Sequence, residues 1–183
     1  MNIDLAKIDF GKSKGSEPVP VIDLGSGTWD DPYTVEGVKA YIDTLTPGAQ
    51  SPLYVYVKGI VSSIDKKYAE TGNYGNAEFY ISDDGDGNDF QCWRLKYFYD
   101  YKYDEVNTVS EKYDIAVGDK VIIYGKVMLY GTSTYETVQN RAYMYILNGW
   151  TGPVPDNLIV FTDNGVYDTT WASAVIVNVN PVP

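Results

Sequence analysis

The segment from residue 53 to residue 64 constrains the fold most, because apolar and polar side chains alternate along it with a period of two. Gly59 interrupts the alternation before a further apolar run at 60–64, as expected of a long strand with a bulge or a bend. The pattern predicts a first strand with one buried face. Leu53, Val55 and Val57 lie on one side of it, and Tyr54, Tyr56 and Lys58 on the other.

Four later segments also have the alternation or composition of strands. The second and third are centred on residues 79–81 and 90–93, and the Asp- and Gly-rich stretch between them predicts a hairpin. Residues 97–118 are expected to form an extended connection, followed by strands at 120–130 and 134–147. The alternation predicts an inner face of Val55, Val57, Phe79, Ile81, Phe90 and Cys92, opposite Tyr56, Tyr80, Gln91 and Trp93.

One short helix is predicted before the first strand, over residues 35–45, where apolar residues recur at helical spacing. Thr34 is its expected N-cap, and Pro47 and Gly48 end it. Gly37 weakens this helix by up to about 1 kcal/mol on propensity alone. The residues before the helix, 1–27, have the Gly, Ser and Pro content of a polar arm.

The C-terminal region, residues 150–183, predicts three further short strands at 158–162, 166–170 and 172–180. The first two flank an Asn164-Gly165 pair, a strong hairpin signal. Residues 156–183 contain no Lys or Arg and end in an alternating valine strand, which would be prone to aggregation if left bare. We therefore expect this strand to pair with an edge of the barrel or with a neighbouring copy of the chain.

Composition narrows the classes of function. The 183 residues predict one principal domain, here 28–149 with its helix, and no apolar run is long enough for a membrane span. Histidine is absent, which removes Ser-His-Asp and Cys-His catalysis and His-based zinc sites. Paired carboxylates for glycoside hydrolysis remain open, but among 25 acidic residues a suitable pair has little diagnostic value. We expect no enzymatic activity and no cofactor.

Two groups of residues can be interpreted as structural or as functional. Cys92 alternates with Trp93 and is expected to be an inward core residue, because no activating base is identifiable. Asp84, Asp86 and Asn88 have the alternate spacing of oxygen ligands for Ca²⁺, although the EF-hand pattern fails. A solvated turn between the second and third strands is the preferred interpretation, so we predict no metal site.

Six ordered pieces of the chain resemble the OB-fold domains found in surface and secreted proteins of Bacteroidetes. The resemblance spans about residues 27–149 and implies a five-stranded Greek-key barrel in a protein located outside the cell or on its surface. The signal peptide and lipoprotein cysteine usual in that family are not visible here, and residues after 149 lie outside the resemblance. The matching pieces are GTWDDPYTV (27–35), YVKGIVSSI (56–64), YGNAEFYISDDG (74–85), FQCWR (90–94), VGDKVIIYGK (117–126) and ILNG (146–149).

In OB barrels the surface around strands two and three is the usual ligand surface. Aromatic side chains there can stack on sugars or bases, and the net charge of −11 favours an uncharged glycan or a protein over nucleic acid. A role as a structural subunit of a surface assembly, a covered second core, and a single-stranded nucleic-acid-binding role all stay open. The candidate ligand residues are Tyr56, Tyr80, Gln91, Trp93 and Arg94.

Overall fold

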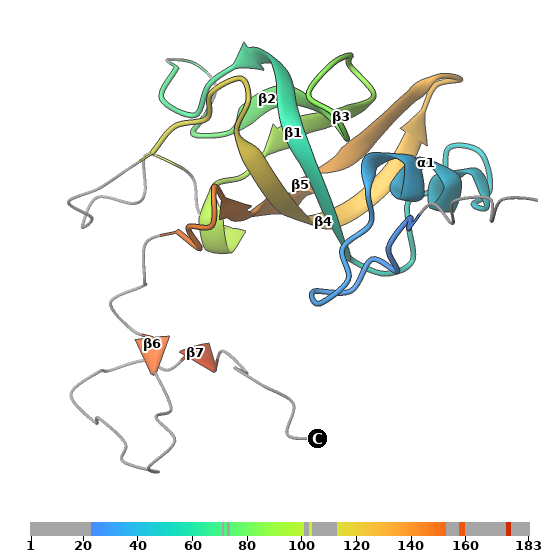
Figure 1. The fold of residues 1–183 in the computed structure, drawn as a ribbon, viewed down its shortest axis with the longest axis horizontal. Coiled ribbons are helices and arrows are strands. Elements are labelled where there is room, and N and C mark those ends of the chain that lie inside the picture. The colour runs from blue at the N-terminus through green and yellow to red at the C-terminus, as the bar shows by residue number, and fades with distance from the viewer. Residues whose placement is uncertain are drawn as a thin grey trace, which may run out of the picture.

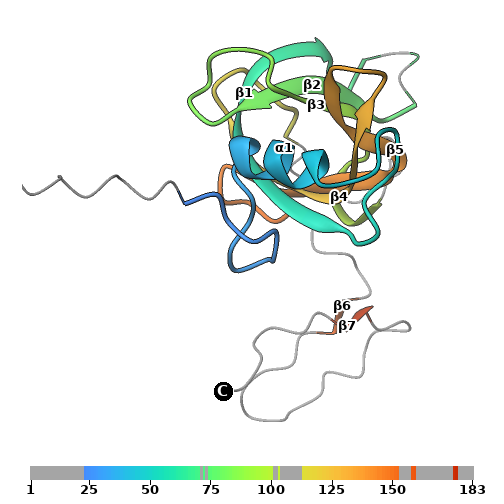
Figure 2. The ribbon, with the colours of Figure 1, turned by 90° about the vertical axis from the view of Figure 1, so that its right-hand side faces the viewer.

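Five strands close into one barrel, in the order β1-β2-β3-β5-β4 (Figures 1 and 2). The structure, a computed structural model, describes residues 23–70, 72, 74–100, 103, 113–152, 158–159 and 175–176. Neighbouring strands run antiparallel except β3 and β5, which pair in parallel. This confirms the predicted mostly-β, OB-type barrel. The strands are β1 (Val55–Lys66), β2 (Ala77–Ser82), β3 (Phe90–Leu95), β4 (Lys120–Tyr130) and β5 (Thr134–Leu147).

The predicted helix is present as α1 (Val35–Asp43) and lies across one end of the barrel (Figure 2). Thr34 caps it, because its hydroxyl oxygen accepts the backbone N–H of Gly37 at 2.9 Å. The buried face of α1 carries Val35, Val38 and Ile42, which belong to the same core as the strand residues. The helix ends at Asp43, two residues before the predicted end.

The inner face of the barrel is the one that the alternation predicts. All six predicted inner residues are buried, whereas Leu53, the first residue of the predicted alternation, precedes β1 and is 70% exposed. Gly59 lies in regularly paired strand, and the register shifts of β1 come later, after Val61 and Ile64. A Cβ on Gly59 would lie 3.1 Å from the side chain of Ile81, so the glycine provides space for close packing.

The connection after β3 contributes to the core, and the expectation of a plain extended link is wrong at its start. Tyr97 and Phe98 are buried, and Phe98 begins a 3-10 helix, η2 (Phe98–Asp100). The ring of Tyr97 lies 4.9 Å from that of Tyr68, and the ring of Phe98 lies 4.9 Å from that of Trp150. The segment that contains η2 lies beside the end of β5, on the side of the barrel away from α1 (Figure 1).

The termini are described only in part. Residues 24–27 of the predicted arm are bound to the barrel: Leu24 O accepts the N–H of Thr34, and Gly27 O accepts that of Tyr56. Strands β6 (Leu158–Ile159) and β7 (Val175–Ile176) pair in parallel within the first and third predicted C-terminal strands. Residues 1–22, the predicted strand 166–170 with its turn, and the predicted edge docking lie outside the described residues. No helix in the described part of the chain is long and apolar enough to cross a membrane.

Candidate ligand-binding faces of the barrel

Three of the predicted ligand residues share the outer surface of β2 and β3. Tyr80 lies directly opposite Gln91, and Trp93 follows two residues further along β3 on the same side of the pleat. All three side chains are half-buried and therefore partly exposed to solvent. The sequence pattern therefore assigned these residues to the correct face.

A bulge in β3 brings Arg94 to the same surface. Ala77 pairs with Leu95 and Phe79 with Cys92, so Glu78 alone faces two residues of β3. Arg94 adopts a positive φ of 44°, which a side chain other than glycine rarely adopts. Strict alternation would place Arg94 inside and Leu95 outside. The bulge reverses both, so that Leu95 is fully buried and the guanidinium lies 5.4 Å from the centre of the Trp93 ring.

Glu78 is a buried carboxylate beside these residues. Its side chain is 6% exposed, and its two oxygens lie 3.7 Å from Lys66 Nζ and 3.6 Å from Arg94 Nε. Within the described residues, its Oε1 has no hydrogen-bond partner. The two cations compensate the charge, but Oε1 is enclosed, so it can accept a hydrogen bond from a ligand only where the partly exposed Arg94 side chain moves aside.

A second carboxylate, Glu136, continues the row from Tyr80 through Gln91 onto β5, where it pairs with Gln91. It is 7% exposed, and burial raises the pKa of its carboxyl group. Burial also raises the pKa of Tyr80, with the charges of Asp65, Glu136 and Glu78 adding to the effect. We name the surface formed by Glu78, Tyr80, Gln91, Trp93, Arg94 and Glu136 the β2–β3–β5 face.

The sequence reasoning missed Glu78 and Glu136. The alternation could have identified Glu78, because Glu78 precedes Tyr80 by two residues and therefore lies on the same face of the strand. Glu136 required knowledge of which residue of β5 pairs with β3, and no local pattern carries that information.

Tyr56, the fifth predicted ligand residue, lies elsewhere. It pairs with Tyr124 of β4, whereas Tyr80 pairs with Ser63, seven residues further along β1 and so about 23 Å away at the usual strand rise. The centre of its ring is 4.4 Å from that of Tyr124 and 4.9 Å from that of Tyr145. Tyr56 therefore belongs to a second surface, the tyrosine patch, which consists of Tyr54, Tyr56, Tyr124, Tyr143 and Tyr145.

The acidic turn between β2 and β3 makes structural contacts. Asp83 accepts the backbone N–H groups of Val35 and Glu36 at 2.7 and 2.9 Å, at the start of α1. Asp84 accepts the N–H of Asp86 and the hydroxyl of Ser82, and these hydrogen bonds lower the pKa of its carboxyl group. These contacts tie the turn to itself and to the helix.

The same turn contains the weak metal candidates. Asn88 Oδ1 accepts the hydroxyl of Ser63 at 2.6 Å, while Asp84 Oδ1 is used within the turn. Among the described residues, no group of three or more His, Cys, Asp or Glu side chains could hold a metal ion. The contacts of Asp84 hold the turn together, and that of Asn88 attaches the turn to β1.

Cys92 occupies the inward position that the alternation predicts. It is fully buried, and burial raises the pKa of its thiol. The reactive thiolate form is therefore disfavoured at this position.

Comparison with known proteins adds no relative. No protein-family model matches the chain, and no curated protein is detectably similar to it. The functional argument therefore depends on the two surfaces described above.

Proposed function

We propose that the chain is a non-enzymatic binding module that acts outside the cell and binds uncharged glycans on the β2–β3–β5 face. The observation that carries the proposal is the bulge next to Trp93, where the partly exposed Arg94 covers the carboxylate of Glu78, whose enclosed Oε1 has no hydrogen-bond partner among the described residues. A sugar has an apolar ring face and several hydroxyl donors. An aromatic ring packs against the first, and a carboxylate accepts hydrogen bonds from the second.

The charges on this face favour a neutral ligand over a nucleic acid. Lys66 and Arg94 both lie within 3.7 Å of the single carboxylate of Glu78, which compensates one of their two positive charges. Glu136 adds a second buried carboxylate, and the whole chain carries a net charge of −11. Phosphate groups would be repelled, whereas sugar hydroxyls would find acceptors. Single-stranded nucleic acid remains the alternative ligand.

The extracellular part of the proposal depends on the resemblance of six sequence pieces to OB-fold domains of Bacteroidetes surface and secreted proteins. That resemblance bears on location and fold, while the choice of ligand depends on the residues of the face itself. The two parts can therefore be tested separately.

Titration calorimetry of the full chain with neutral oligosaccharides of glucose, galactose, mannose and xylose tests the proposal. We expect at least one to bind, and Trp93→Ala to weaken that binding by about 2 kcal/mol, or about thirtyfold, because a central aromatic contact is lost. Glu78→Gln should weaken it as well, because an amide is a poorer acceptor than a carboxylate.

Trp29→Ala is the matched control, because Trp29 is 55% exposed and lies before α1, outside the β2–β3–β5 face. It should leave binding unchanged. Failure of all four neutral saccharide classes to bind, or equal losses in the Trp93 and Trp29 variants, would contradict the proposal. Sub-micromolar binding of a single-stranded oligonucleotide with steep salt dependence would favour the alternative.

A further inference from the structure

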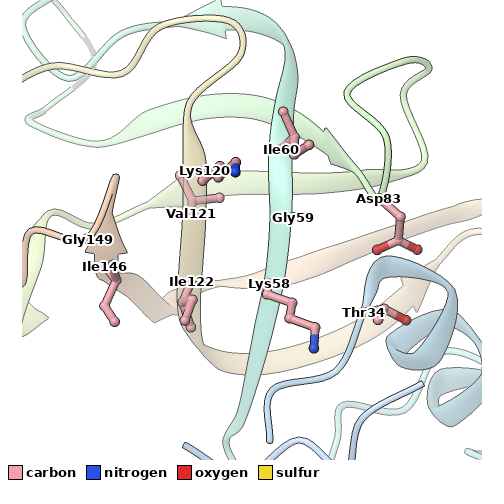
Figure 3. A pocket seen from close by; sticks show the side chains of 10 residues that line it. All are labelled: Thr34, Lys58, Gly59, Ile60, Asp83, Lys120, Val121, Ile122, Ile146 and Gly149. Atoms are coloured by element: carbon pink, nitrogen blue, oxygen red, sulfur yellow. The ribbon is translucent and has the colours of Figure 1, made fainter. Parts of the chain in front are cut away.

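A hollow of about 410 Å³ opens on a different part of the barrel, between the start of α1 and strands β1 and β4 (Figure 3). Its apolar lining comes from Val121 and from one isoleucine on each of three strands, Ile60, Ile122 and Ile146. Lys58 and Lys120 line it from neighbouring strands. The hollow thus combines an apolar surface with two ammonium groups.

The positive charge in this hollow is available to a ligand. Within the described residues, neither Lys58 nor Lys120 takes part in an ion pair. Asp83 also lines the hollow, but its two carboxylate oxygens accept the N–H groups of Val35 and Glu36. The partial positive charge of the helix N-terminus compensates that carboxylate. In a chain with a net charge of −11, two unpaired lysines in one hollow are a local exception.

The tyrosine patch lies beside the hollow on the same outer face of the barrel. Tyr56 precedes Lys58 by two residues on β1, and Tyr124 follows Ile122 by two residues on β4, so each pair shares a face at a spacing of about 7 Å. Tyr145 adjoins Ile146 on β5 at a register shift against β4, and its ring lies 4.9 Å from that of Tyr56, so it shares this face despite the adjacent position. Aromatic rings on three adjacent strands therefore extend the surface of the hollow.

We propose that the hollow and the tyrosine patch form a second ligand site, for an anionic saccharide. A carboxylate or sulfate group of the ligand lies between Lys58 and Lys120, and the adjoining sugar rings pack on Tyr56 and Tyr124. An extended aromatic patch suits a chain of rings better than a single small anion. The site shares none of its residues with the β2–β3–β5 face and does not depend on the function proposed for that face.

Calorimetry of the full chain with the trimer of galacturonic acid, its methyl ester and a sulfated galactose trimer tests this site. We expect one or both anionic trimers to bind, and the uncharged ester to bind at least about tenfold more weakly, because it lacks the charge that the lysines attract. Comparison of the uronate with the sulfate shows which anionic group the hollow prefers. Added salt should weaken binding of the anionic trimers.

Lys58→Met and Lys120→Met should each weaken binding of the anionic trimer severalfold, while Lys58→Arg and Lys120→Arg retain it. Lys67→Met is the matched control, since it removes one exposed lysine outside the hollow and should have no effect. The site is wrong if neither anionic trimer binds, if acid and ester bind equally, or if both methionine variants bind normally. If Trp93→Ala abolished binding of the anionic trimers, these ligands would bind on the β2–β3–β5 face and the proposed site in the hollow would be wrong. If Trp93→Ala reduced only the binding of neutral glycans, the assignment of the anionic trimers to the hollow would stand.

Discussion

Gly37 lies inside α1, where helix propensity alone makes alanine the better residue by about 1 kcal/mol. In the fold, a Cβ at this position would overlap the carbonyl oxygen of Leu24. That carbonyl is held in place, because it accepts the backbone N–H of Thr34 at 3.0 Å. The close approach of two backbones, which no local pattern reveals, makes the glycine necessary.

We therefore predict that Gly37→Ala lowers the free energy of unfolding by about 2 kcal/mol, since the steric cost exceeds the gain in propensity. Urea denaturation followed by tyrosine and tryptophan fluorescence measures the change. Ala40→Gly, at an exposed position of the same helix, is the control and should cost about 1 kcal/mol. A Gly37→Ala variant more stable than the parent would show that residue 24 does not pack against α1 as described.

The attachment of α1 to the barrel depends on the turn between β2 and β3. Asp83 is 48 residues distant from Val35 in sequence, yet it accepts two of the N–H groups that a helix start leaves unpaired. We predict that Asp83→Ala lowers the free energy of unfolding by about 1–2 kcal/mol, through loss of these hydrogen bonds and of the charge at the helix N-terminus.

Chemical denaturation at neutral pH measures that change, with Asp86→Ala as the control. Asp86 is an exposed aspartate of the same turn, and its substitution should change the stability by less than about 0.5 kcal/mol. Equal effects of the two substitutions would indicate that net charge, and not the contact with α1, determines the stability. Asp83→Asn should have an intermediate effect, because one acceptor oxygen remains.

At the scale of elements, the sequence predicted which face of each strand is buried better than it predicted the pairing and register of the strands. Alternation is a local property, so Val55, Phe79 and Cys92 could be assigned to the core without knowledge of their partners. The bulge that turns Arg94 outward depends on pairing with β2, and the residues 93–94 carry no local sign of it. The grouping of Tyr56 with Trp93 failed for the same reason, since distance along a strand requires the register.

At the scale of the whole molecule, the spacing of the strands predicted a five-stranded barrel, but it did not predict how the ends of the barrel are closed. Tyr97 and Phe98 lie in a segment without periodicity, and their burial depends on Tyr68 and Trp150, which are distant in sequence. The stability of the barrel therefore depends on neutral tyrosine side chains in two places: among the buried aromatic residues at this end, and in the tyrosine patch on the outer surface.

The barrel should therefore lose stability at alkaline pH. Burial, and then the neighbouring hydroxyls of Tyr145 and Tyr124, raise the pKa of Tyr56 from 10.0 to about 12, and burial also raises the pKa of Tyr68 well above its usual value. Below pH 10 these groups are neutral in both the folded and the unfolded chain, so their contribution to stability is fully present. Between pH 10 and pH 12 the unfolded chain loses protons that the folded chain retains, and the free energy of unfolding falls.

Urea denaturation at a series of alkaline pH values, with tyrosinate absorbance recorded in parallel, measures the loss of stability and the ionisation of the tyrosines. Tyr56→Phe should reduce the loss across this range by about 1 kcal/mol, since solvent screens a partly exposed ring, whereas Tyr130→Phe, at a 64% exposed position, should not. A stability that stays constant to pH 12, or equal effects of the two substitutions, would contradict the role assigned to the tyrosine patch.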